Sequence, residues 1–167
     1  IYQPRGPTGW HEVASFVGAS YFRLVGFHQV YGAAARGLAV DTGEPGGEEF
    51  PRFTELWLEK PRPGAKAFRM YALLESPRAI GAYQFFIHPG ANTAVQVQTS
   101  VFVRKAGKKF GFAPLTSMFL LGENRTRYIA DYRPEVHDSD GLLLEAGPEQ
   151  WLWRPLVNPD KKHHISR

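Results

Sequence analysis

The densest group of ionisable residues in this sequence lies in the stretch Asp131–Leu142. Its twelve residues include four carboxylates, one histidine and one arginine. Charges crowded together shift one another's pKa values, and such groups serve proton transfer or the recognition of polar ligands. Aspartate and glycine are also frequent in turns, so Asp138–Gly141 can equally be a structural turn.

Two carboxylates of this stretch have a spacing that glycoside hydrolysis can use. An inverting glycosidase needs an acid and a base about 6.5–9.5 Å apart, on opposite sides of the scissile bond. On extended backbone, Asp138 and Asp140 would point to one face and lie roughly 6.5–7 Å apart. This spacing permits the reaction without being diagnostic of it.

Aromatic residues supply the other half of a sugar site, because their rings stack on the apolar faces of pyranoses while polar side chains bind the hydroxyls. The candidates for stacking are Tyr21, Tyr83, Tyr132, Trp151 and Trp153. Packing in the core is the alternative for each of them, and it is what we expect of Trp57. Trp151 and Trp153 are two residues apart on one face of a predicted strand, beside Arg154.

Other chemistries find little support in the sequence. There is no cysteine, which excludes disulfides, thiolate metal ligands and cysteine nucleophiles. No histidine pair has the spacing of a metal site, and the adjacent pair His163–His164 lies in a basic tail. The serines lack the context of a nucleophile elbow. We therefore predict neither a metal nor any other cofactor.

Composition indicates one globular domain of 167 residues, with 43% hydrophobic and 22% charged residues. The net charge of +4 comes from scattered basic residues, a pattern typical of solvated loops and unfavourable for nucleic-acid binding. No apolar run approaches the roughly 20 residues that span a bilayer, so membrane insertion is not expected. The first residues, Ile1–Arg5, resemble neither a start nor a signal peptide, and we interpret them as a mature end or an internal cut.

Runs with a period of two residues lie between the 17 glycines and 13 prolines. They predict a meander of four antiparallel strands with short connections, formed by Phe53–Lys60, Phe68–Glu75, Gly81–His88 and Ala94–Arg104. In the last strand, the valines would share the buried face. Gln96 and Gln98 would then lie on a solvated outer face, or line a groove there.

Shorter segments complete the prediction. Val13–Leu24 is expected to be a strand broken near Gly18, and Leu142–Leu144 with Gln150–Trp153 a late hairpin. Ala33–Arg36 and Pro114–Phe119 are each expected to form a single helical turn. The polar loop Asp41–Glu49 either overhangs a site or is a simple connection. Short strands separated by turn residues favour an all-β fold, an antiparallel β-sandwich.

Several motifs resemble, in order and spacing, the bacterial periplasmic (osmoregulated) glucan biosynthesis proteins of the G/D type, the MdoG/OpgG-like family. The resemblance extends from about residue 12 to about residue 160. The motifs are Ala19–Arg23, Ala35–Ala39, Gly47–Phe53, Tyr71–Leu74, Ala113–Phe119, Gly122–Asn124, Tyr132–Leu142 and Trp151–Leu156. The segment Asp160–Arg167 departs from the family pattern.

This resemblance implies a β-sandwich of the galactose-mutarotase-like type, a periplasmic location and a β-1,2-linked glucan as ligand. It also implies that residues 1–167 are one sandwich portion, from the central part of a larger protein. The family's general acid, its immunoglobulin-like C-terminal domain, the strands that complete the sandwich and the export signal would then lie outside this sequence.

The resemblance also suggests roles for individual residues. Some members resemble inverting endo-β-1,2-glucanases, whose base maps to Asp138, with Asp140 as the second choice. The pocket would be shaped by Tyr132, Arg133, Glu135 and His137. Together with Tyr21, Arg23, Trp151, Trp153 and Arg154, these four residues form the predicted substrate-binding set.

Two other interpretations remain open for the same residues. The protein can bind glucan without cleaving it, or act with the membrane glucosyltransferase that makes the glucan. Alternatively, the acidic motif can be a buried ion network that stabilises the sandwich.

Overall fold

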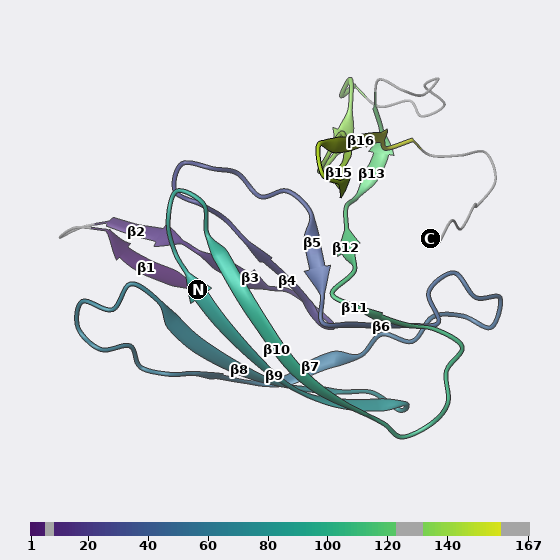
Figure 1. Cartoon of the computed structure of the whole chain (residues 1–167), viewed down its shortest axis with the longest axis horizontal. Coiled ribbons are helices and arrows are strands. Elements are labelled where there is room, and N and C mark those ends of the chain that lie inside the picture. Colours follow the sequence, from purple (N-terminus) through teal and green to yellow (C-terminus); the bar gives the residue numbers. More distant parts are fainter. Residues whose placement is uncertain (6–8, 123–131, 158–167) are drawn as a thin grey trace. The chain divides into compact units, whose positions relative to one another are not determined.

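The computed structural model describes residues 1–5, 9–122 and 132–157, and every regular element in these ranges is a β-strand (Figure 1). The predicted all-β, antiparallel class is confirmed. The chain divides into two compact units, Ile1–Leu115 and Thr116–Arg167. The assignment of residues 1–167 to one sandwich domain stays a prediction.

The four longest strands form the predicted meander. They are β7 (Arg52–Leu58), β8 (Phe68–Glu75), β9 (Ala79–His88) and β10 (Ala94–Val103), in the sheet order β10-β9-β8-β7. All three neighbouring pairs are antiparallel, and the long strands lie side by side in Figure 1. The structure confirms this part of the prediction to within two residues at each strand end.

Alternation along β8 and β9 gives this sheet a buried and an outer face. Met70, Ala72 and Leu74 are buried on β8, and Phe85 and Ile87 are buried on β9. The residues between them point to the opposite face, because successive side chains of a strand alternate. The period-two pattern in the sequence therefore indicates which side chains of β8 and β9 face the core.

A second sheet has the order β12-β5-β4-β3. Its strands are β3 (Ala14–Phe16), β4 (Tyr21–Leu24), β5 (Ala34–Arg36) and β12 (Leu115–Thr116). The predicted break near Gly18 is confirmed as the turn between β3 and β4, where Gly18 has a φ of 56°.

The helical turns expected at Ala33–Arg36 and Pro114–Phe119 are wrong, because strands β5 and β12 lie in these segments. The amide of Arg36 donates to the carbonyl oxygen of Pro114 at 3.1 Å. This partner is distant in sequence, so the local residue pattern did not reveal the extended conformation.

The other strands form two-stranded antiparallel pairs. In the first unit these are β1 (Tyr2–Arg5) with β2 (Gly9–Glu12), and β6 (Leu38–Val40) with β11 (Phe110–Phe112). In the second unit they are β13 (Phe119–Leu121) with β14 (Val136–His137), and β15 (Gly141–Gly147) with β16 (Gln150–Pro155).

The core of the first unit lies between the two four-stranded sheets, which makes this unit a β-sandwich. Five rings pack with neighbouring centroids 5.1–6.1 Å apart, and they belong to Phe16, Phe22, Phe53, Tyr83 and Phe85. Tyr83 is buried, and its hydroxyl donates to the carbonyl oxygen of Gly37 at 2.9 Å. It is therefore a core residue, which was the alternative given for it, and it does not stack on sugar.

Trp57 differs from expectation in the opposite direction. It was predicted in the core, yet 49% of its surface is exposed. It lies on β7, which ends the sheet order, so a strand pairs with β7 on one side only within the described sheet.

The loop at residues 41–49 is attached to the rest of the first unit by Asp41. Its Oδ1 atom accepts hydrogen bonds from the amides of Lys108 (2.7 Å) and Lys109 (3.0 Å). Its Oδ2 atom forms an ion pair with the guanidinium of Arg78. These hydrogen bonds and the guanidinium hold the pKa of Asp41 below its ordinary value of 3.8. Asp41 therefore fixes this loop in place.

Candidate functional site

The described part of the acidic motif begins at Tyr132 and lies in the second unit, while Asp131 is outside the described residues. Strand β14 carries Val136 and His137 and pairs with β13, so that His137 is opposite Phe119. The two rings are 5.3 Å apart between centroids. Strand β13 therefore provides the support on which the motif is held.

Asp138 follows β14 directly and is held by the backbone of Met118. The Asp138 amide donates to the Met118 carbonyl oxygen at 2.9 Å, and the Met118 amide donates to Asp138 Oδ2 at 3.2 Å. The residue is exposed. Its other carboxylate oxygen makes no hydrogen bond to any described residue. One oxygen is thus fixed, and the other is open to solvent or ligand.

His137 lies between two carboxylates, and only 12% of its side chain is exposed. Its Nε2 atom is 3.0 Å from Glu135 Oε2, and its Nδ1 atom is 3.5 Å from Asp140 Oδ1. The hydrogen bond with Glu135 and the negative charges of both carboxylates raise the pKa of His137 above its ordinary 6.5, against the smaller opposing effect of burial. The two carboxylates therefore favour the charged form of the imidazole more than in a free histidine.

Asp140 is directed differently from Asp138. Its side chain is 82% exposed and approaches His137, whereas that of Asp138 is bonded to Met118. Residues 138–140 connect β14 to β15 and are not a strand. The spacing expected for two aspartates on one extended face therefore does not apply here.

The predicted late hairpin is confirmed as β15 and β16. Trp153 is opposite Leu143 and Trp151 is opposite Glu145, so the two indoles share one face of the hairpin. They are 52% and 64% exposed, respectively. Arg154 directly follows Trp153, is opposite Leu142, and therefore points to the other face.

Trp153 covers the residue that follows the second aspartate. A Cβ atom built on Gly141 would lie 2.6 Å from Trp153 Cζ2 and 2.5 Å from the Arg154 carbonyl oxygen. The indole therefore packs directly on the Gly141 backbone. An aromatic surface thus lies beside the acidic loop at residues 138–140.

Tyr132 and Arg133 begin the described motif on an exposed segment. The Tyr132 ring is 94% exposed, and the guanidinium carbon of Arg133 is 6.0 Å from its centroid. The structure thus brings Glu135 and Asp140 each into contact with His137 and places Trp153 against the same loop.

The other two predicted substrate-binding residues, Tyr21 and Arg23, belong to β4 of the first unit. The Tyr21 ring is 5.3 Å from the guanidinium carbon of Arg36, and the guanidinium of Arg23 lies over the ring of Tyr31 at 5.1 Å. Arg36 is buried and forms an ion pair with Glu48. It fixes Tyr21, a role that the sequence analysis did not assign.

Two further positions at the acidic motif were missed. The backbone of Met118 holds Asp138, and the ring of Phe119 packs on His137. Both belong to a motif that carries the family resemblance, which was the only signal that could have pointed to them.

The described residues contain no group of three or more His, Asp or Glu side chains arranged to hold a metal ion. No helix long and apolar enough to cross a membrane occurs in residues 1–5, 9–122 and 132–157. The pair His163–His164 and the segment Asp160–Arg167 lie outside the described residues.

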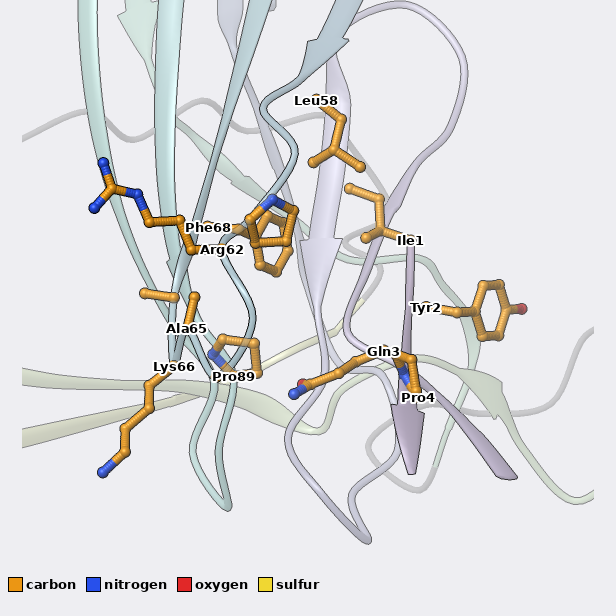
Figure 2. A pocket seen from close by; sticks show the side chains of 13 residues that line it. Ile1, Tyr2, Gln3, Pro4, Leu58, Arg62, Ala65, Lys66, Phe68 and Pro89 are labelled. Carbon is orange, nitrogen blue, oxygen red and sulfur yellow. The ribbon is translucent and has the colours of Figure 1, made fainter. Parts of the chain in front are cut away.

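A cavity of about 330 Å³ lies in the first unit (Figure 2). Its lining comes from residues 1–4, from the end of β7, from the connection between β7 and β8 with Phe68 at the start of β8, and from Pro89. None of the predicted site residues lines it. The cavity therefore adds nothing to the acidic motif.

The family model described as "Periplasmic glucan biosynthesis protein, MdoG" matches residues 1–166.

Proposed function

The chain belongs to the MdoG family of periplasmic glucan biosynthesis proteins, and we propose that within this role its acidic motif binds and hydrolyses a β-1,2-linked glucan. The family supports a periplasmic location and a part in glucan biosynthesis. The hydrolytic reaction, the linkage and the residue roles below are our proposal.

Asp138 acts as the general base in this proposal. Its Oδ2 atom is anchored by the Met118 amide, and its free oxygen takes a proton from a water molecule. That water attacks the anomeric carbon, and the bond from this carbon to the glycosidic oxygen breaks with inversion. A general acid from outside the described residues protonates the leaving oxygen. Asp140 is the second choice as base, because its side chain is exposed but directed toward His137.

The observation that carries the proposal is an anchored, exposed carboxylate beside an aromatic surface. Trp153 packs on Gly141, and Trp151 continues the same exposed face. Such rings stack on sugars, while charged side chains near them bind hydroxyl groups. The imidazole of His137 and the carboxylate of Glu135 are suited to orienting the sugar and the attacking water.

The test is Asp138→Asn in the intact protein, assayed on linear β-1,2-glucan. Asparagine keeps the size of the side chain and an oxygen that can accept from Met118, but it is not a base. We expect turnover to fall by about 10²–10⁴-fold, the usual contribution of a general base, while glucan affinity and melting temperature stay near wild type. Asp140→Asn is the matched control and should lower turnover less.

Unchanged turnover in Asp138→Asn would remove this residue from the mechanism. A large fall in melting temperature with the same variant would favour the structural interpretation, in which Asp138 mainly joins β14 to Met118.

A second candidate function is glucan binding or assembly without cleavage, together with the membrane glucosyltransferase. The observation in its favour is that both faces of the hairpin expose apolar side chains. One face carries the two tryptophans, and Leu142, Leu144 and Leu152 on the other are 37–40% exposed. Exposed apolar patches commonly mark protein interfaces. Thin-layer chromatography of the products separates the two functions, since a binding protein yields no shorter oligosaccharides.

A further inference from the structure

A row of four side chains crosses the outer face of the sheet β10-β9-β8-β7. The strand register places Trp57 opposite Tyr71, Tyr71 opposite Gln84, and Gln84 opposite Gln98. Trp57 is 49% and Tyr71 is 38% exposed, whereas their neighbours on the inner face of β8 are buried. Three spacings of about 4.8 Å make this row roughly 14 Å long.

A second row lies two residues further along the strands. It consists of Arg69, Phe86 and Gln96, which are opposite one another in register. The guanidinium carbon of Arg69 is 4.6 Å from the centroid of the Phe86 ring. Each row therefore combines aromatic surface with groups that form hydrogen bonds.

The amides of these rows have unused hydrogen-bonding capacity. The side chains of Gln84, Gln96 and Gln98 make no hydrogen bond to any residue in the described part of the chain. An amide both donates and accepts, as a sugar hydroxyl does. The seven residues of the two rows include no carboxylate, and their one charged group, the guanidinium of Arg69, lies over the Phe86 ring, so the two rows suit an uncharged ligand.

The second row ends at a hollow of about 330 Å³. Arg69 and Phe86 line it from the sheet, and Glu59, Lys60 and Arg62 line it from the connection between β7 and β8. The outer face is therefore bounded at this end by a concave region with charged side chains on its rim.

We infer that this outer face binds a stretch of glucan, with the rings of Trp57 and Tyr71 stacking on glucose units and the three amides bonding to their hydroxyls. The ligand is an uncharged glucan because stacking surfaces and unpaired amides occur together in rows without carboxylates. This inference rests on the proposed function, since it takes the ligand class from there, but it concerns residues that the hydrolytic proposal does not use.

Calorimetric titration of the intact protein with linear β-1,2-linked gluco-oligosaccharides tests it. Trp57→Ala should weaken the affinity by about tenfold, as loss of an aromatic contact residue commonly does. Gln98→Ala should weaken it to a smaller extent, and because Gln98 is exposed this substitution leaves the core intact. The matched control is Phe102→Ala, which removes a 66% exposed ring from the same face outside both rows and should leave the affinity at the wild-type value.

The outcomes separate this inference from the proposed function. If the unmutated protein binds glucan and both Trp57→Ala and Gln98→Ala bind it equally well, the inference that the outer face binds glucan is wrong, while the proposed function stands. The same loss in Phe102→Ala as in Trp57→Ala would also overturn it, since the effect would not depend on the rows. A change of sedimentation coefficient in Trp57→Ala without loss of glucan affinity would assign the face to a second copy instead. A wild-type protein that binds no glucan would overturn both proposals.

Discussion

His137 is the residue whose charge depends most directly on the geometry of the acidic motif. The hydrogen bond to Glu135 raises its pKa above 6.5, and the charge of Asp140 adds to this effect. We therefore expect an NMR titration of His137 to have its midpoint above 6.5, and Glu135→Gln to lower that midpoint. Glu145→Gln, in strand β15, is the control and should leave it unchanged.

The same shift has a consequence for stability. Because the folded-state pKa is raised, the stabilisation by the charged imidazole is complete below pH 6.5 and is lost as the pH rises through the folded-state value. Between these two pH values the melting temperature should fall more in the wild type than in Glu135→Gln. A wild-type midpoint at or below 6.5 would contradict the geometry of the motif.

Asp41 predicts the opposite dependence on pH. Its pKa is lowered below 3.8, chiefly by the amide of Lys109, so its contribution to stability is complete above 3.8 and is lost as the pH falls through the folded-state pKa. Asp41→Asn tests this charge cleanly, since Asn also tolerates the left-handed backbone found here, with a φ of 58°. The variant should melt below the wild type at pH 7, and the difference should shrink toward about pH 2. An equal difference at both pH values would show that the charge of Asp41 does not matter.

Single residues also show why the site could be predicted only in part. Asp138 and Asp140 stand out in the sequence because charged groups cluster around them. The partner of Asp138 is the backbone of Met118, and a backbone group has no signature in residue type. Tyr83, a candidate for stacking, lies in the core, whereas Trp57, which was expected in the core, is half exposed. In an alternating run, the residue type of an aromatic side chain does not indicate which face it occupies or how near it lies to a sheet edge.

At the scale of elements, the hairpin β15–β16 depends on the absence of a side chain at Gly141. A Cβ atom there would meet Trp153 at 2.6 Å and the Arg154 backbone at 2.5 Å. We expect Gly141→Ala to cost about 1–3 kcal/mol, as overpacking commonly does, and to weaken glucan binding by displacing the indole. Thermal unfolding and calorimetric titration measure the two effects.

Gly147 provides the matched control in the same hairpin. A Cβ atom there would have its nearest contact at 3.6 Å, on the end of the flexible Gln150 side chain. Gly147→Ala should therefore leave both stability and glucan affinity near wild type. If the two alanine variants behaved alike, the packing of Trp153 on Gly141 would not be what positions the aromatic surface.

Strand length explains which elements could be predicted. Strands β8, β9 and β10 have eight to ten residues and show several periods of alternation, so the sequence reports them directly. Strands β5 and β12 have three and two residues, too few for a period to appear. Their extended conformation depends on pairing between distant segments, so the alanine-rich run at residues 33–36 and the run that begins with Pro114 resembled helical turns.

At the scale of the whole molecule, buried apolar residues are distributed unevenly between the two units. Every residue of the main hydrophobic cluster lies in Ile1–Leu115, including the five packed aromatic rings. In the described residues after Leu115, Leu121 is the one buried hydrophobic side chain. Folding stability therefore depends on the first unit, because buried apolar area is the main favourable contribution.

This distribution predicts that a polypeptide of residues 1–115 folds by itself. We expect it to unfold in one cooperative thermal transition with a near-ultraviolet circular dichroism signal from its packed aromatic rings. Phe85→Ala in this polypeptide should cost about 3–5 kcal/mol, since Phe85 is fully buried and its ring packs on the other four aromatic rings. Phe102→Ala removes an exposed ring instead and should change little. If a polypeptide of residues 1–115 showed no cooperative transition, its core would require side chains beyond Leu115. The two compact units would then not fold independently of each other.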